Sequence, residues 1–177
     1  TGRPRVFRNA DLSPEALLAS ACLPTMFQAV EIDGQAYWDG GYSGNPTMTP
    51  LINECVSDDT IIVGINPVER PGVPKSARDI LNRLNEVAFN AVLLKELQMM
   101  ALLREVADPG NEKTAHWARM RVHLLRSDLL LGLGASSKLN AEWDFLTMLR
   151  DEGRAAAEAF LAENGASLGQ RSTLPIE

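Results

Sequence analysis

Asp39 stands in the setting that is best suited to acid–base chemistry in this sequence. It is followed by Gly40 and Gly41, and it lies between a predicted hairpin strand and a predicted helix. A carboxylate at a strand-to-loop junction, next to two glycines that let another backbone come close, is well placed to act as a general base beside a nucleophile. Asp-Gly-Gly is also a common turn sequence, so the same residues fit a purely structural turn.

Ser43 is a weak candidate for the nucleophile that such a base would serve. The run from Gly41 to Asn45 begins like the G-x-S-x-G nucleophile elbow, but Asn45 replaces its last glycine. No predicted strand leads into a sharp turn at Ser43. The pattern therefore favours an ordinary loop serine.

The two histidines and two cysteines predict neither a catalytic triad nor a metal site. His123 lies within a predicted strand and His116 just before it, and neither has thiol or carboxylate neighbours at ligand spacing in the sequence. Cys22 and Cys55 are too few for a disulfide framework, so we expect reduced, buried thiols. Gly132-Leu133-Gly134 lacks the third glycine and the lysine of a phosphate loop. We expect no metal and no cofactor.

The first seventy residues predict the elements that must position Asp39. Asp33-Gly34 favours a type I′ turn between two short apolar runs, which makes a hairpin. Ser13-Pro14 is typical of a helix start, and Pro24 of a helix end. The expected order is a strand at 5–8, a helix at 14–21, hairpin strands at 30–32 and 35–38, a helix opening at Asn45-Pro46, and a central strand at 61–65 covered on both faces.

The remaining residues predict a long helix, a strand and a last helix. Apolar residues recur at helical spacing from Ile80 to Leu97, and Ser76 with Asp79 forms a capping box before them. We expect helices at 76–107 and 141–164, a strand at 120–125, and Met99 and Met100 in the core. Alternating strands and helices predict the α/β class.

Length and composition set limits on the class of protein. The chain has 177 residues, 45% of them hydrophobic and 23% charged, which is typical of one folded domain. Its formal charge of −6 opposes nucleic-acid binding. No apolar run approaches the length of a membrane span. The chain begins Thr-Gly-Arg-Pro, without an initiator Met, so we expect it to be part of a longer protein.

Three linked segments resemble the patatin-like phospholipase family of bacteria. They are the run from Ala19 to Phe27, the run from Val30 to Gly34, and Trp38-Asp39-Gly40-Gly41 followed by Asn45-Pro46. Ser137-Lys138-Leu139 and Trp143 also resemble bacterial members, more weakly. The resemblance implies a three-layer α/β/α fold, of which this chain is the C-terminal portion. It also implies that Asp39 completes a serine–aspartate dyad.

The chain also departs from the family pattern. Gln28-Ala29 stands where prolines are frequent, and Gly44 where a second asparagine is frequent; both differences concern loop shape. The glycine-rich oxyanion loop and the G-x-S-x-G serine of the family lie upstream of the aspartate, and neither motif occurs in these 177 residues.

The resemblance implies a lipid acyl hydrolase of the phospholipase A or esterase type, acting on lipid esters. Residues 1–177 would form the C-terminal part of one domain, with the aspartate segment in about 1–70 and the long helix, strand and last helices in 76–177. The chain alone would be inactive, because the serine lies in the missing upstream half. Two alternatives remain: a patatin-fold scaffold without catalysis, and an unrelated α/β domain.

The expected partners follow from the same reasoning. They are the lipid or ester substrate and the upstream segment of the same protein. That segment or another copy of the chain, in a homo-oligomer, would cover the strand edge and the apolar face left open. Nucleic acid is not expected. We expect a cytoplasmic protein with brief contact at a membrane surface.

Overall fold

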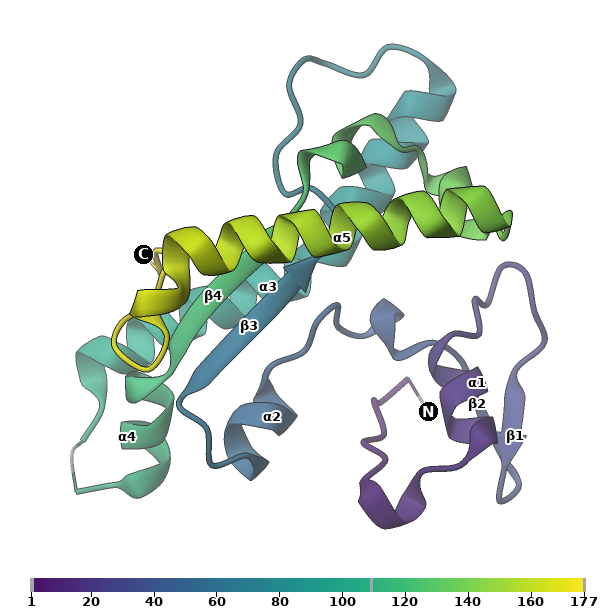
Figure 1. Ribbon diagram of the computed structural model, residues 1–177. Helices are drawn as coiled ribbons and strands as arrows, with labels where there is room; N and C mark the ends of the chain where they lie inside the picture. Colours follow the sequence, from purple (N-terminus) through teal and green to yellow (C-terminus); the bar gives the residue numbers. More distant parts are fainter. Residues whose placement is uncertain (1, 109, 177) are drawn as a thin grey trace.

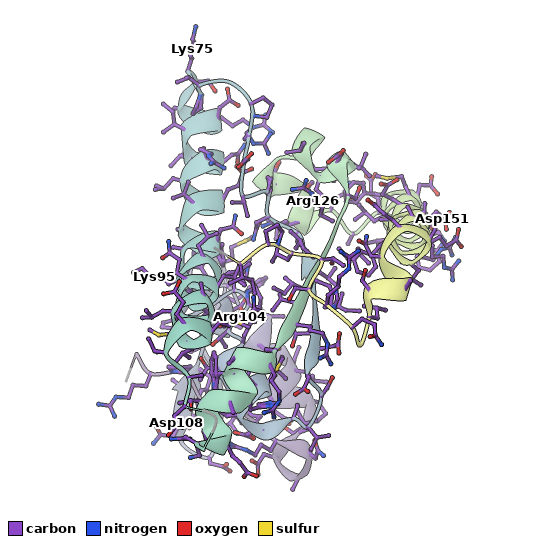
Figure 2. All side chains as sticks on the ribbon, turned by 90° about the vertical axis from the view of Figure 1, so that its left-hand side faces the viewer. Lys75, Lys95, Arg104, Asp108, Arg126 and Asp151 are labelled. Atoms are coloured by element: carbon purple, nitrogen blue, oxygen red, sulfur yellow. The ribbon has the colours of Figure 1, made fainter. Side chains whose placement is uncertain are left out.

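Three layers form the main body of the computed structural model, which describes residues 2–108 and 110–176. Strands β3 (Asp59–Gly64) and β4 (Arg121–Arg126) pair in parallel at its centre. Helix α3 (Ala77–Val106) lies on one face of this sheet and α5 (Trp143–Asn164) on the other, as both views show (Figures 1 and 2). The predicted α/β class with an α/β/α arrangement is confirmed.

The two faces of the sheet are filled differently. Successive side chains of a strand point to opposite faces, so Val122 joins the apolar core on the α3 side while His123 faces Phe160 of α5, with ring centroids 6.4 Å apart. The core on the α3 side consists of Met48, Ile52, Ile62, Leu93, Met100, Met120 and Val122.

The N-terminal region lies beside these layers (Figure 1), and Met48 and Ile52 near its end reach the core on the α3 side. It contains α1 (Pro14–Ser20), the hairpin of β1 (Val30–Ile32) and β2 (Gln35–Tyr37), and α2 (Thr49–Glu54). The hairpin turn has Asp33 at φ 52° and Gly34 at φ 72°, as a type I′ turn requires. Ser13 caps α1 by accepting a hydrogen bond from Ala16 N at 3.2 Å. The predicted hairpin and first helix are confirmed.

Helix α3 is continuous over 30 residues, and Ser76 Oγ accepts from Asp79 N at its start, as predicted. The predicted strand at 120–125 and last helix at 141–164 are also present, with β4 shifted by one residue and α5 beginning at Trp143. Helix α4 (Glu112–Arg119) was not predicted. The residue in the sequence that could have indicated this helix is Asn111, whose side chain caps its first turn.

Two predicted elements of the N-terminal region are wrong. Residues 5–8 are not a strand. Their side chains attach them to the neighbouring elements, since Phe7 packs on the Tyr37 ring at 5.6 Å and Arg8 pairs with Glu54, and the carbonyl of Arg8 accepts from Asp11 N in the following 3-10 turn. The helix expected from Asn45-Pro46 begins only at Thr49. Its first turn is fixed from outside by the carboxylate of Glu96 on α3.

Three predictions of burial are also wrong. The strand at 61–65 is not covered on both faces, since α5 lies over β4 and leaves Ile61 46% and Val63 65% exposed. Met100 is in the core, but Met99 lies on the outer side of α3 and is exposed. Cys22 is buried as expected, whereas Cys55 is exposed because it follows the end of α2.

Candidate functional site

The three segments of the family pattern form one hydrogen-bonded unit around Asp39. The backbone N–H of Asp39 donates to Cys22 O at 2.9 Å, at the end of α1. Cys22 Sγ donates to Gln28 O at 3.1 Å, and Trp38 Nε1 donates to Phe27 O at 3.1 Å. The hairpin strand that delivers Asp39 is therefore fixed to the helix and loop before it.

The carboxylate of Asp39 is held by the backbone that follows it. Oδ1 accepts a hydrogen bond from Gly41 N at 2.7 Å, so Asp39 caps the short 3-10 turn Gly40–Tyr42. The side chain is half-buried. Within residues 2–108 and 110–176 no group donates to Oδ2, which leaves this oxygen able to accept a proton.

Gly41 leaves little room for a side chain. A Cβ at this position would lie 3.1 Å from Asp39 Oδ1 and 3.4 Å from a ring carbon of Phe89. The next residue, Tyr42, also packs edge-on against Phe89, with centroids 5.3 Å apart. The turn after Asp39 therefore rests directly on α3, and a side chain at position 41 would have to displace the Asp39 carboxylate by a few tenths of an ångström.

Glu96 of α3 fixes the loop that follows. Its carboxylate accepts from Thr47 Oγ1 and Thr49 Oγ1, each at 2.9 Å, and from the backbone N–H of Met48. A carboxylate at the start of a helix satisfies amides that lack partners there. Asp39 is thus positioned from both sides, by Cys22 before it and by α3 after it.

Asp39 lines a cleft of about 790 Å³ between the N-terminal region, β3 and α3. Leu23 and Met26 lie on the side of Asp39, and Phe89 and Leu93 come from α3. Strand β3 contributes residues 60–64. A mostly apolar cleft with one carboxylate in its wall suits a substrate that has an apolar chain and one reactive polar group.

Lys138 is a residue of this cleft that the sequence analysis assigned no role. Its Nζ donates to Asn66 Oδ1 at 2.7 Å and lies 5.8 Å from the centroid of the Phe89 ring. Partial burial lowers the pKa of Lys138, while the charge of Glu86 opposes this shift. Only the resemblance around Ser137-Lys138-Leu139 pointed to it.

The other candidates from the sequence lie elsewhere. His123 is fully buried, with Nε2 3.0 Å from Asp59 Oδ1 and Nδ1 3.0 Å from Thr173 Oγ1. His116 Nδ1 lies 3.2 Å from Asp58 Oδ1. Neither histidine lines the cleft, and Ser43 is an exposed loop residue that does not line it either. The structure therefore does not bring Ser43 or a histidine together with Asp39 in this cleft.

No group of three or more His, Cys, Asp or Glu side chains in the described part of the chain could hold a metal ion. No helix in that part is both long and apolar enough to cross a membrane.

Comparisons with known proteins single out the N-terminal region. Residues 2–52 match the family model of patatin-like phospholipases. A search of curated proteins and a search of solved structures each found no match. The family match contains Asp39 and ends before β3, so it supports the resemblance for the part of the chain that forms the hydrogen-bonded unit. In general terms it suggests lipid acyl hydrolysis.

Proposed function

We propose that this chain supplies the general base of a lipid acyl hydrolase, with Asp39 as the aspartate of a serine–aspartate dyad. The serine would come from a G-x-S-x-G motif in a part of the protein outside this sequence. The observation that carries the proposal is the Asp39 carboxylate, which is oriented through Oδ1 by the Gly41 amide in the wall of an apolar cleft. Its second oxygen accepts no hydrogen bond from the described chain.

The reaction uses Asp39 twice. Oδ2 takes the proton from the serine hydroxyl as the serine oxygen attacks the ester carbonyl carbon. The tetrahedral intermediate then expels the alcohol, which leaves with that proton, and an acyl-enzyme remains. Asp39 next takes a proton from water, whose oxygen attacks the acyl carbon; the serine leaves with the proton. Backbone amides that stabilise the oxyanion would come from the same missing part.

The open edge of strand β3 supports the proposal that another part of the same protein completes the domain. Strand β3 pairs only with β4 within the described chain, and Ile61 and Val63 beside the cleft are exposed. A preceding strand of the same protein would pair with the open edge of β3 and place its serine near Asp39. Residues 1–70 would then carry the aspartate segment, and 76–177 would support it.

The test compares two Asp→Asn variants of the whole protein on a short-chain p-nitrophenyl ester. Asp39→Asn keeps the acceptor for Gly41 N but cannot take a proton, so we expect kcat to fall by about 10²–10⁴-fold. Asp33→Asn is the matched control, because this exposed residue in the hairpin turn has a positive φ that asparagine adopts readily. Equal activity of the two variants would show that Asp39 serves only to cap the turn Gly40–Tyr42, and it would favour the scaffold alternative.

A further inference from the structure

A hollow lined by basic side chains adjoins the Asp39 cleft at the start of α3. Its volume is about 520 Å³, and its walls are residues 70–75, the first turns of α3 and residues 131–134. The charged side chains that line it are four cations and one carboxylate: Arg70, Lys75, Arg78, Arg83 and Asp79. Glu86 pairs with Arg70 and Arg83, so the hollow keeps a surplus of two positive charges. The chain as a whole carries −6, so this surplus is a local feature.

Hydrogen bonds fix the walls of the hollow to α3. Arg70 Nη1 donates to Leu131 O at 2.6 Å, and Arg83 Nη2 donates to Val68 O at 3.0 Å. Both arginines also pair with the buried Glu86, at 2.6 and 3.1 Å. The hydrogen bonds from Arg70 lower the pKa of Glu86; burial opposes this shift, and Arg83 adds to it. The folded chain therefore sets the shape of the hollow before any ligand binds.

Two cations of the hollow take no part in this framework. Arg78 Nη2 donates to Ser136 Oγ at 3.5 Å, and Arg78 forms no ion pair within the described part of the chain. Lys75 forms none with residues 2–108 and 110–176 either, and it projects at the end of α3 (Figure 2). Cations that have no carboxylate partner are available to a negatively charged ligand.

The hollow and the cleft meet beside α3. A cavity of about 110 Å³ shares Asn85 and Lys138 with the cleft, and Asn82 with the hollow. Ser136, to which Arg78 of the hollow donates, itself lines the cleft. A substrate bound in the cleft can therefore extend past Lys138 into the hollow.

We propose that the basic hollow binds the head group of the substrate lipid and selects lipids with a net negative charge. This rests on the proposed function, since it takes the ester to lie at Asp39. The lipid phosphate would then lie at Lys138, whose Nζ uses one of its three donors on Asn66 Oδ1. The glycerol of phosphatidylglycerol adds no charge, so the lipid is attracted. The trimethylammonium group of phosphatidylcholine would lie beside Arg78, which repels it.

Kinetics of the whole protein on soluble dihexanoyl lipids measures this preference. Lipids below their micelle concentration present no charged surface, so the ratio of kcat/KM for phosphatidylglycerol to that for phosphatidylcholine reports the hollow alone. Charge interactions at exposed sites change affinity by about three- to fivefold, so we expect a ratio of about 3–5 in wild type. Arg78→Gln should bring the ratio to about 1, and Arg78→Glu should invert it.

Lys95→Gln is the matched control for overall charge. Lys95 is an exposed cation on the outward side of α3 and lines neither the cleft nor the hollow (Figure 2). Its substitution should leave the ratio as in wild type. A wild-type ratio of about 1, or equal effects of Lys95→Gln and Arg78→Gln, would overturn the proposal.

Isothermal titration calorimetry separates the head-group site from the chemistry. In whole protein carrying Asp39→Asn, which is expected to consume lipid slowly, dihexanoyl phosphatidylglycerol should bind about three- to fivefold more tightly than dihexanoyl phosphatidylcholine. Addition of Arg78→Gln should make the two affinities equal. The same preference in a protein whose wild type hydrolyses no ester would overturn the proposed function and support the head-group site. Equal affinities before Arg78 is changed, or binding of neither lipid, would overturn the head-group site even where wild type hydrolyses the p-nitrophenyl ester.

Discussion

The N-terminal region and the three-layer body are held together in different ways. Residues 9–42 leave Leu17, Leu18, Phe27 and Trp38 exposed and are held together by hydrogen bonds around Asp39, whereas Met48 and Ile52 after them belong to the core of the body. The body fully buries Met100, Val122 and His123. Asp39, the residue proposed as the general base, is thus positioned by a segment that has few buried side chains. This segment packs against the well-packed three-layer body. Changes in the body should alter stability, and changes in the loop should alter activity.

Asp59 connects three segments of the body. Its Oδ2 accepts from Arg121 Nε at 2.9 Å and Nη2 at 2.6 Å. Its Oδ1 accepts from Gly169 N at 2.9 Å and lies 3.0 Å from Nε2 of the buried His123. One carboxylate thus joins the start of β3, strand β4 and the C-terminal segment.

The largest effect on stability is expected for Asp59→Ala. The change leaves the half-buried Arg121 and the fully buried His123 without their acceptor, and removing one partner from such a group costs at most about 3 kcal/mol of unfolding free energy. Urea unfolding followed by circular dichroism measures the loss. Asp58→Ala removes a more exposed partner of His116 and should cost less than half as much. An equal loss for both would contradict the central place of Asp59.

Acid should remove the contribution of Asp59. The hydrogen bonds from Arg121 lower the pKa of Asp59 well below its usual range; burial opposes the shift, and Gly169 N–H and His123 add to it. Because the folded pKa is below the unfolded one, the stabilisation is complete above the unfolded pKa, about 4, and is lost as pH falls below it. The stability difference between wild type and Asp59→Asn should therefore shrink from about pH 5 to about pH 3. A constant difference would show that the charge is not responsible.

In the loop, Gly41→Ala should reduce activity without a matching loss of stability. The new Cβ would press against Asp39 Oδ1 and the Phe89 ring, and displacing a catalytic group by a fraction of an ångström lowers kcat by roughly 10-fold or more. Gly40→Ala is the control, because a Cβ there meets nothing within 4 Å. Kinetics on the whole protein should separate the two variants. Equal kcat values would show that the loop tolerates the change.

The smallest effect is expected for Lys138→Met. The cation lies in the cleft wall beside Asn66 and would attract the negative phosphate of a phospholipid, an exposed interaction of about 1 kcal/mol or less. KM should rise a few-fold for a phospholipid and remain unchanged for a neutral ester. A matching rise for both substrates would assign Lys138 to the shape of the cleft instead.

Local signals in the sequence predicted where helices and turns occur better than they predicted which residues these elements contact or bury. Asp33-Gly34 and the Ser76 cap carry their own turn and helix chemistry, so the hairpin and α3 were predicted correctly. The helix start near Asn45 was wrong because Glu96, some fifty residues later, fixes it. The exposure of Ile61 and the place of Lys138 in the cleft depend on which elements lie beside them. The role proposed for Asp39 rests on the family pattern, since no local rule separates it from a turn aspartate.

The most direct test of the central claim is labelling of the whole protein with a fluorophosphonate, which reacts only with activated serines. We predict that one serine, within a G-x-S-x-G motif, becomes labelled in wild type and that Asp39→Asn slows this labelling at least about tenfold, as the loss of a general base implies. Mass spectrometry of the labelled peptide identifies the serine. Absence of labelling in wild type, or equal rates in wild type and Asp39→Asn, would contradict the serine–aspartate dyad.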